Sequence, residues 1–222
     1  MARPKKPEER RRIRDVAFNV FARKGLESTS FSDIAKEASV SKSLVQYYFP
    51  KKEQFVSDFI DRSLTITEEI IEEDLDYEFK HELAKLFAMG LAQFHFSINN
   101  KALDAMRMDI LRDRGSTEVV VRYAIDWIFK HTTVFPLETQ EEEDMAKKTI
   151  VYVIGGTFDY LYDCMLYDVD FDLDFLFFAS TAIMKPYLTN PFGEAEAIKE
   201  ALSPEWLDAA LKKYNERLFV EA

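Results

Sequence analysis

The segment Ser30–Phe49, SFSDIAKEASVSKSLVQYYF, carries the pattern that decides the fold. Ser30, with Asp33 three residues later, resembles a capping box that starts a short helix. Only two residues after Ala38 separate that helix from Ser41, which can cap a second one. The segment therefore predicts two short helices joined by a tight turn, which is a helix-turn-helix.

The second helix, residues 42–49, has two different sides. At 100° per residue, one arc holds polar side chains and the other apolar ones: Lys42, Ser43, Gln46 and Tyr47 against Leu44, Val45, Tyr48 and Phe49. A helix this short cannot persist alone, so its apolar side must pack on neighbouring helices. Its polar side then presents donors and acceptors suited to base edges and phosphates.

Residues from about 10 to 56 resemble the DNA-binding domain of the TetR family of bacterial transcriptional regulators. The matching positions are Ala17, Phe21, Gly25, Thr29, Ser30, Phe31, Asp33, Ile34, Ala35, Ala38, Val40, Ser41, Lys42, Tyr48, Phe49, Lys52, Glu53 and Phe55. Ser39 and Ser43 depart from the pattern by standing where the family commonly has glycine, and Gln46 stands where it often has a phosphate-contacting tyrosine. The resemblance covers about a quarter of the chain.

We expect the helix-turn-helix and its flanks to supply the DNA contacts. The predicted phosphate contacts are Thr29, Gln46, Tyr47, Lys51 and Lys52, and the predicted base contacts are Lys42, Ser43 and Leu44; Ser30 completes the set. The basic arm at residues 1–7 is open to two interpretations. It is either a solvated tail or a segment that touches phosphate or enters a minor groove through Arg3, Lys5 or Lys6.

The charge of the chain is divided in a way that suits this function. The net charge of −11 is unusual for a DNA-binding protein. Residues 1–55, however, hold 13 Lys and Arg against 7 Asp and Glu, a balance of +6, and the remainder carries −17. Basic residues therefore lie where nucleic acid would be contacted, and the acidic remainder would be repelled from a duplex.

The composition also indicates the cellular compartment in which the protein is expected. Cys164 is the single cysteine, so no disulfide framework within the chain is possible and a reducing cytoplasm is expected. The charged N-terminus lacks the apolar stretch that would follow it in a signal peptide. The sequence also contains no run of about 18 apolar residues, so no membrane-spanning helix is expected. We expect a cytoplasmic protein that associates with the nucleoid when it is bound to DNA.

Helical periodicity continues through the whole chain, and no segment predicts a strand. We expect an all-α protein with a helix-turn-helix domain at 1–55 and a larger regulatory and dimerisation domain at 56–222. Gly25 is expected to end the first helix in a left-handed cap. The predicted helices outside the helix-turn-helix span 8–24, 53–74, 78–98, 101–114, 116–134 (capped by Ser116), 142–167, 173–188 and 204–219; Pro191 and Gly193 are expected to break the pattern.

Two helices, 142–167 and 173–188, are more apolar than one core-facing stripe requires. A two-fold dimer is the usual way to bind two neighbouring DNA half-sites, and the resemblance implies a dimer made by C-terminal helices. Gly155–Gly156 would permit a close backbone approach. The predicted interface residues are Ile150, Val151, Ile154, Phe158, Leu161, Phe175, Leu176, Phe178 and Ile183.

The resemblance also implies a ligand pocket among the middle helices, for an effector that is partly apolar. Candidate lining residues are Phe94, His95, Met106, Met108, Tyr123, Trp127, Phe158 and Tyr162. Aromatic and methionine side chains at helical spacing are equally explained as plain core, and this alternative stays open. No cofactor or metal is expected, because the histidines and the cysteine lack ligand spacing and the Asp168–Asp174 segment lacks the glycine and final carboxylate of a calcium loop.

These features predict a homodimeric transcriptional regulator, a repressor that a small molecule releases from a palindromic operator. The alternative is a DNA-anchored protein-interaction hub, in which the acidic body and the helix 204–219 with Trp206 would bind a protein partner. An apolar cavity would favour the first hypothesis, and a solid core with an exposed apolar patch the second. No phosphate-binding loop or serine nucleophile motif is present, so an enzyme is not expected.

Overall fold

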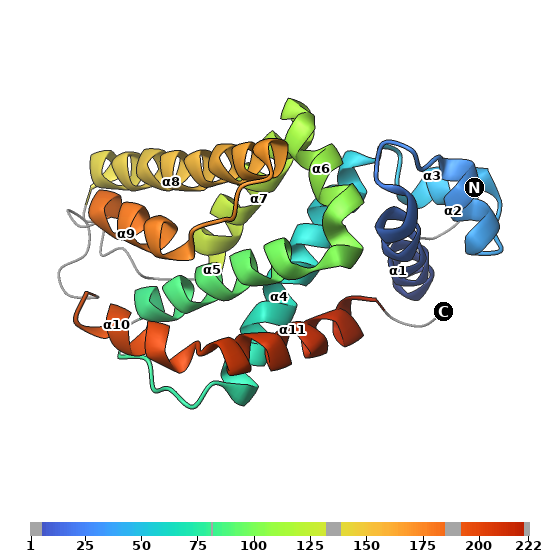
Figure 1. Ribbon diagram of the computed structural model, residues 1–222. Coiled ribbons are helices and arrows are strands. Elements are labelled where there is room, and N and C mark those ends of the chain that lie inside the picture. The colour runs from blue at the N-terminus through green and yellow to red at the C-terminus, as the bar shows by residue number, and fades with distance from the viewer. Residues whose placement is uncertain (1–5, 81, 132–138, 185–191, 220–222) are drawn as a thin grey trace.

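The computed structural model describes residues 6–80, 82–131, 139–184 and 192–219, and over these residues it is all-helical, as predicted (Figure 1). The elements are α1 Pro7–Lys24, α2 Phe31–Glu37, α3 Lys42–Tyr48, α4 Glu53–Asp74, α5 Glu82–Asn99, a 3₁₀ turn η1 Lys101–Leu103, α6 Asp104–Arg112, α7 Arg114–His131, α8 Gln140–Tyr167, α9 Leu173–Met184, α10 Phe192–Ala201 and α11 Pro204–Leu218.

Helices α1, α2 and α3 form a small bundle at one end of the molecule (Figure 1). The beginning of α4 closes this bundle with aromatic side chains. Phe55 stacks on Phe49 with ring centroids 3.9 Å apart and meets Phe21 edge-on at 5.5 Å. One turn later, Phe59 meets Phe18 edge-on at 5.3 Å. Buried aromatic pairs of this kind fix the position of α4 relative to the bundle.

The same helix α4 continues into the larger part of the molecule. Its 22 residues carry an apolar stripe through Ile66, Ile70 and Ile71, all of which are buried. Because α4 packs on both parts, no loop separates them at residue 55, and the division of the chain at 55/56 stays a prediction.

The larger part is a body of two outer layers around a middle one. Figure 1 shows α8 and α9 along one side and α10 and α11 along the other, with α5 and α7 between them. Helix α11 packs on α4 and α5, where Tyr214 is completely buried. Surface ion pairs hold it there, from Lys213 to Asp74 at 2.6 Å and from Arg217 to Glu73 at 2.5 Å.

Several predicted helix ends are displaced, each for a local reason. The helix expected at 116–134 with Ser116 as its cap begins instead at Arg114. Asp113 is the capping residue, because its carboxylate accepts a hydrogen bond from Ser116 N, in the first turn, at 2.9 Å. The stretch expected as one helix at 101–114 is divided into η1 and α6. The helix expected from 78 begins at Glu82.

The expectation about Gly193 was wrong, and the one about Gly25 was confirmed in part. Gly193 was expected to break the pattern, yet it lies inside α10, a helix that the sequence did not predict. Gly25 ends α1 as predicted and has a positive φ of 82°, but its ψ of 163° is not that of a left-handed helical residue. Residues 132–134 and 185–188, parts of two predicted helices, lie outside the described residues. Within the described ranges, no helix is both long and apolar enough to span a membrane.

Candidate functional site

The outward side of α3 has the composition that its sequence predicted. Lys42, Ser43 and Gln46 are exposed, whereas Val45 and Tyr48 are buried against the bundle. Leu44 and Tyr47, which were both expected to touch DNA, are half-buried and pack against the core beside this surface. The exposed side of α3 is thus a row of polar side chains fixed to a rigid base.

Capping groups hold the two short helices in place. The Ser30 hydroxyl accepts from Asp33 N at 3.2 Å, and Asp33 accepts from Ser30 N at 2.9 Å, which is the predicted capping box. The Ser41 hydroxyl accepts from Leu44 N at 3.2 Å, as predicted for the second cap. Hydrogen bonds from Lys24 and Ser30 hold the pKa of Asp33 far below its usual range. The carboxylate is therefore charged at neutral pH and favours the helix start.

The turn between the two helices contains a strained residue. Ser39 has a φ of 53°, in the left-handed region where glycine is favoured. This is the position where the TetR pattern commonly has glycine, so the structure explains why that pattern prefers it. The turn keeps its geometry despite the serine, because Val40 N donates to Ala35 O at 2.9 Å.

Three exposed lysines lie in α2, in α3 and just before α4. Lys36, Lys42 and Lys51 make no ion pair or side-chain hydrogen bond with any other residue that the structure describes. Lys42 and Lys51 were predicted contacts, whereas Lys36 was missed, although its place on the outer face of α2 could have been found from the helical period. These unpaired cations are free to contact phosphate. In the N-terminal arm, Arg3 and Lys5 lie outside the described residues.

Two predicted phosphate contacts instead have structural partners, which corrects the expectation for their side chains. Thr29 is only 1% exposed, and its hydroxyl donates to Gly25 O at 2.6 Å. The ammonium of Lys52 donates to Leu26 O at 2.9 Å and to Glu27 O at 3.2 Å. Both side chains therefore fasten the loop that follows α1, and neither is free to reach a duplex. The Ser30 hydroxyl is likewise engaged in its capping box.

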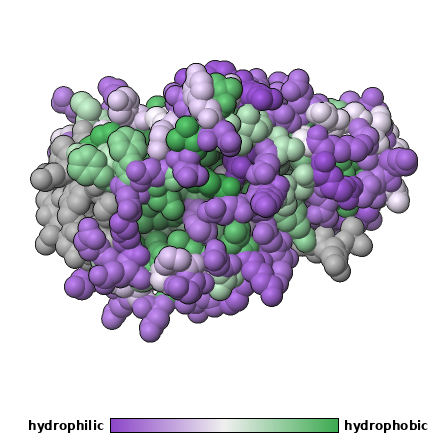
Figure 2. Space-filling view, viewed as in Figure 1, coloured by the Kyte–Doolittle hydropathy of each residue, from purple (hydrophilic) through white to green (hydrophobic). Residues whose placement is uncertain are grey.

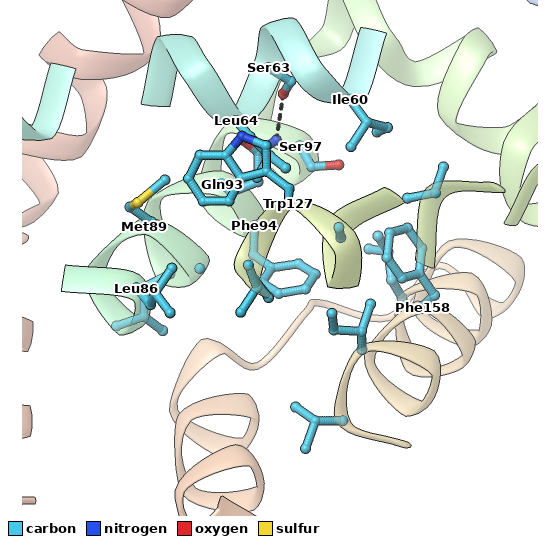
Figure 3. Close-up of a pocket in the computed structure, with 18 of the residues that line it drawn as sticks. Ile60, Ser63, Leu64, Leu86, Met89, Gln93, Phe94, Ser97, Trp127 and Phe158 are labelled. Carbon is cyan, nitrogen blue, oxygen red and sulfur yellow. Dashed lines mark hydrogen bonds between the residues drawn. The ribbon is translucent and has the colours of Figure 1, made fainter. Parts of the chain in front are cut away.

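The body contains a cavity of about 310 Å³ among α4, α5, α6, α7 and α8 (Figure 3). Figure 3 shows Phe94, Trp127 and Phe158 converging on it from three different helices. Most of the other lining side chains are aliphatic, among them Leu86, Leu91, Leu103, Ile110, Val120, Ile128, Val153 and Ile154. A volume and a lining of this kind are typical of sites for small, largely apolar molecules.

One wall of the cavity carries a connected polar group. The Tyr214 hydroxyl lies 2.5 Å from Ser63 Oγ, and Gln93 Nε2 donates to the same oxygen at 2.8 Å. Gln93 Oε1 in turn accepts from Thr67 Oγ1 at 2.7 Å. Burial raises the pKa of Tyr214 to about 12, so its hydroxyl stays protonated at neutral pH.

The predicted pocket residues fall into two groups. Phe94, Met106, Trp127 and Phe158 line the cavity, whereas the side chains of the other four do not: His95, Met108, Tyr123 and Tyr162. Tyr123 donates to Asp61 at 2.7 Å, and His95 lies 3.8 Å from Asp208 of α11. These four are therefore corrected to positions outside the cavity wall.

The surface of α8 and α9 is exceptional for its exposed apolar side chains (Figure 2). Over the described residues, every large apolar side chain that is exposed lies between positions 145 and 178: Met145, Val151, Tyr152, Leu166, Tyr167, Val169, Phe175 and Phe178. Of the predicted interface residues, Val151, Phe175 and Phe178 belong to this set, and Ile183 is half-buried. Gly156 is exposed, and a side chain at either Gly155 or Gly156 would meet nothing within 4 Å.

The remaining predicted interface residues face inward. Ile150, Leu161 and Leu176 are buried within the chain, and Ile154 and Phe158 are half-buried. All five line the cavity, so they belong to its wall rather than to an outer surface. Helix α8 thus has apolar side chains on two faces, one that lines the cavity and one that is exposed on the exterior.

Comparison with known proteins agrees with this geometry. Residues 13–58 match the sequence profile described as "Bacterial regulatory proteins, tetR family", and this segment contains most of α1, all of α2 and α3, and the beginning of α4. Residues 13–58 are therefore similar to the DNA-binding domain of TetR-family regulators, and we call this segment the TetR domain. The chain is also 46% identical over 46 residues to the uncharacterized HTH-type transcriptional regulator YuxN of Bacillus subtilis (strain 168). That match spans 21% of this chain and 16% of the relative.

One solved structure extends the similarity beyond the N-terminal segment. The structure of the multidrug binding protein EbrR complexed with imidazole aligns with a TM-score of 0.50 at 16% identity, covering 80% of this chain and 96% of that one. A TetR-family transcriptional regulator from Streptomyces coelicolor aligns with a TM-score of 0.47 at 15% identity, covering 95% and 90% of the two chains. At these identities, the first alignment supports the all-helical fold with its small N-terminal domain.

A hydrogen bond, an ion pair and a close backbone approach link the TetR domain to α4 and α6. Asp109 of α6 accepts from Glu27 N at 2.9 Å, in the loop that follows α1. The guanidinium of Arg10 on α1 pairs with Asp58 on α4 through contacts of 2.5 and 2.8 Å. Gly25 lies so close to α6 that a Cβ there would be 2.5 Å from Asp109 Oδ2. Helices α4 and α6 both line the cavity, so each connects the cavity to the TetR domain.

Proposed function

We propose that this protein is a DNA-binding transcriptional regulator that acts in the cytoplasm as a homodimer and whose operator affinity changes when a small molecule enters the cavity. The observation that carries the proposal is the exposed polar row of α3 on a domain of the TetR family, flanked by Lys36, Lys42 and Lys51, which have no partner among the described residues. A rigid helix with this surface suits the major groove of DNA.

The exposed side chains divide naturally into two roles. Lys42, Ser43 and Gln46 lie along α3 and would contact base edges, whereas Lys36 of α2 and Lys51, just before α4, would contact phosphates. If a dimer makes six to ten phosphate contacts, its affinity would fall about 10³–10⁵-fold between about 50 and 200 mM salt.

Dimerisation is supported by the apolar surface of α8 and α9. Phe178 is 68% exposed and Tyr152 is 70% exposed, and water contact with so much apolar surface is unfavourable. A second copy of the same surface would cover these side chains by two-fold symmetry. Two TetR domains held in this way would bind two half-sites of a palindromic operator.

The cavity supports control by a small molecule. Helix α6 contributes Met106 and Ile110 to the cavity wall, and its Asp109 holds the loop after α1. A ligand that shifts α6 would therefore alter the position of the TetR domain and release the operator, which is the action of a repressor. By thermodynamic linkage, the operator would then weaken ligand binding by the same factor.

The alternative function is a DNA-anchored hub that binds a protein partner. The cavity favours the small-molecule switch, because a hub needs no internal space. Helix α11, which was the candidate docking helix, already packs on α4 and α5, and Trp206 Nε1 donates to Asp74 O at 3.1 Å. The exposed surface of α8 and α9 is the feature that a hub could use instead.

Selection of bound sequences from random duplex oligonucleotides tests the proposal directly. We expect a palindrome whose half-site spacing matches two-fold related α3 helices. The variants Lys42→Ala and Gln46→Ala should each relax the preference at particular bases. Lys51→Ala should weaken binding to all sequences and reduce the salt slope by about 1 for each phosphate that the shortened side chain can no longer reach.

Lys212→Ala is the matched control, because Lys212 is an exposed lysine of α11 far along the chain from the TetR domain. It should leave operator affinity unchanged. Absence of any enriched sequence, or equal loss in the Lys51 and Lys212 variants, would contradict sequence-specific DNA binding. An asymmetric site without repeats would contradict the homodimer alone.

A further inference from the structure

The wall of the cavity lacks a partner for a cationic ligand. Among the lining residues that the structure describes, there is no Asp, Glu, Lys or His, and the single permanently charged side chain is Arg107 of α6. A cation that leaves water needs a negative group nearby, because burial of an uncompensated charge is very unfavourable. Aromatic faces such as Phe94 and Trp127 attract cations only weakly in comparison.

Arg107 does not offer a free positive charge to an anion either. One of its terminal nitrogens pairs with Asp104, three residues earlier on the same helix, at 2.5 Å. The other donates to the main-chain oxygen of Ser97. The guanidinium side chain is 11% exposed and the Asp104 side chain is 53% exposed, so the pair spans from the cavity wall to solvent. Its net charge is zero, and an anionic ligand would have to compete with Asp104.

One donor of Arg107 remains unused. Its Nε is buried and has no hydrogen-bond partner. An unsatisfied buried N–H is unfavourable, so an oxygen acceptor brought by a ligand would gain a strong hydrogen bond from it. By contrast, the polar side chains of Tyr214, Ser63 and Gln93 in the cavity wall already bond to one another. The Arg107 end is therefore the place where the cavity can recognise a polar group.

We propose that the cavity takes an uncharged, largely apolar molecule with one oxygen acceptor, and that Asp104 enforces this preference by neutralising Arg107. The apolar part packs against Phe94, Trp127 and Phe158, and a carbonyl or hydroxyl oxygen takes the Nε–H of Arg107. This inference rests on the proposed function, in which the cavity is the effector site. It adds the chemical class of the effector and the residue that excludes charged analogues.

A matched series of eleven-carbon compounds tests the ligand class: 2-undecanone, undecane, undecanoate and undecylamine. The fluorescence of Trp127 in the cavity wall reports binding, in a Trp206→Phe background that removes the second of the two tryptophans. We expect 2-undecanone to bind about tenfold more tightly than undecane, because of one hydrogen bond from a charged donor, and also more tightly than either charged compound.

Two variants and a control test the role of the ion pair. Asp104→Asn leaves Arg107 charged and unbalanced, and it should raise the affinity for undecanoate about tenfold or more with little change for the ketone. Arg107→Met should remove the preference for the ketone over undecane. Glu118→Gln is the matched control, since it breaks an exposed ion pair with Arg122 on α7, away from the cavity wall, and removes the same charge. It should change no affinity.

The inference is overturned if undecylamine or undecanoate binds the unaltered cavity most tightly, if no compound binds, or if Asp104→Asn acts no differently from Glu118→Gln. Operator binding, measured separately, distinguishes this failure from failure of the proposed function. If the ketone binds selectively but leaves operator affinity unchanged, the proposed ligand class is supported and the proposed role of the cavity as an effector site is contradicted. If undecylamine releases the operator, control by a small molecule is supported and the uncharged ligand class is contradicted.

Discussion

The α1–α3 bundle and the α8–α9 layer differ in how they bury their apolar side chains. In the bundle, the aromatic core of Phe21, Phe49 and Phe55 is buried, and the exposed residues are charged or polar. In the α8–α9 layer, apolar side chains are exposed on one face and border a cavity on the other. The bundle is therefore complete within one chain, while the layer leaves apolar surface that, under the proposed function, a second copy and a ligand cover.

This contrast separates two demands on one polypeptide. A surface that recognises DNA must be rigid, because hydrogen bonds to base edges depend on exact positions. A body that responds to a ligand must instead have space to fill and contacts to change. Helix α4 serves both, with tight aromatic packing at its beginning and cavity-lining residues such as Ile60 and Leu64 farther along.

The largest expected effect compares two phenylalanines. Phe55→Ala opens a void in a closed core and should lower the free energy of unfolding by about 3–5 kcal/mol. Phe158→Ala should cost less than half as much, because the ring already borders empty space and is packed against fewer neighbouring atoms. Urea unfolding of both variants measures the difference. Equal losses would mean that the body is packed as tightly as the bundle.

The second effect concerns the exposed face of α9. In the proposed two-fold dimer, Phe178→Glu places one charge from each protomer in the interface and should weaken association by at least about 100-fold, as expected for a central apolar residue. Sedimentation over a range of protein concentrations measures this change. Ala209→Glu, on the exposed side of α11, is the control and should leave the dimer intact. A dimer that survives the Phe178 change must use another surface.

A smaller effect compares two strained residues, one in each region. Ser39 and Asp168 both have a φ of 53°. Ser39→Gly should raise the free energy of unfolding by about 0.5–1 kcal/mol, because glycine adopts this conformation without strain. Asp168→Gly should raise the free energy of unfolding by less, since aspartate tolerates a left-handed backbone conformation better than serine does. Thermal unfolding of the two variants, each against the unaltered protein, gives the order of the gains.

The smallest effect is a pH dependence in the body. Burial lowers the pKa of His95, against the opposing influence of Asp208. The unfolded chain then binds a proton more readily, so the stability from neutral His95 is fully present above about pH 6.5 and is lost as pH falls. His95→Gln should flatten the decline in unfolding free energy between about pH 7 and 5. An unchanged profile would assign that decline to other groups.

The parts of the structure that the sequence predicted well depend on local interactions. The caps at Ser30 and Ser41 need only three residues of context, and the two sides of α3 follow from the helical period. By the same logic, Gly193 misled the prediction of a helix break, because the propensity of one residue did not decide the state of α10.

The errors about the site involve partners that are distant in sequence. Lys52 resembles a free surface lysine until the loop carrying Leu26 and Glu27 folds over it. Trp127 and Tyr123 share a helix, yet Trp127 lines the cavity while Tyr123 donates to Asp61. Periodicity assigns a residue to one side of a helix, but it does not say which other helix that side meets.

The hydrogen bond between Glu27 N and Asp109 gives this molecule a built-in spectroscopic reporter. The Glu27 amide belongs to the TetR domain, and its acceptor belongs to α6. Its solvent-exchange rate and its nuclear resonance frequency therefore record, at a single atom, whether the two parts of the chain are docked. Titrating a compound into the labelled protein while following that one signal would reveal interdomain movement even before any operator is known.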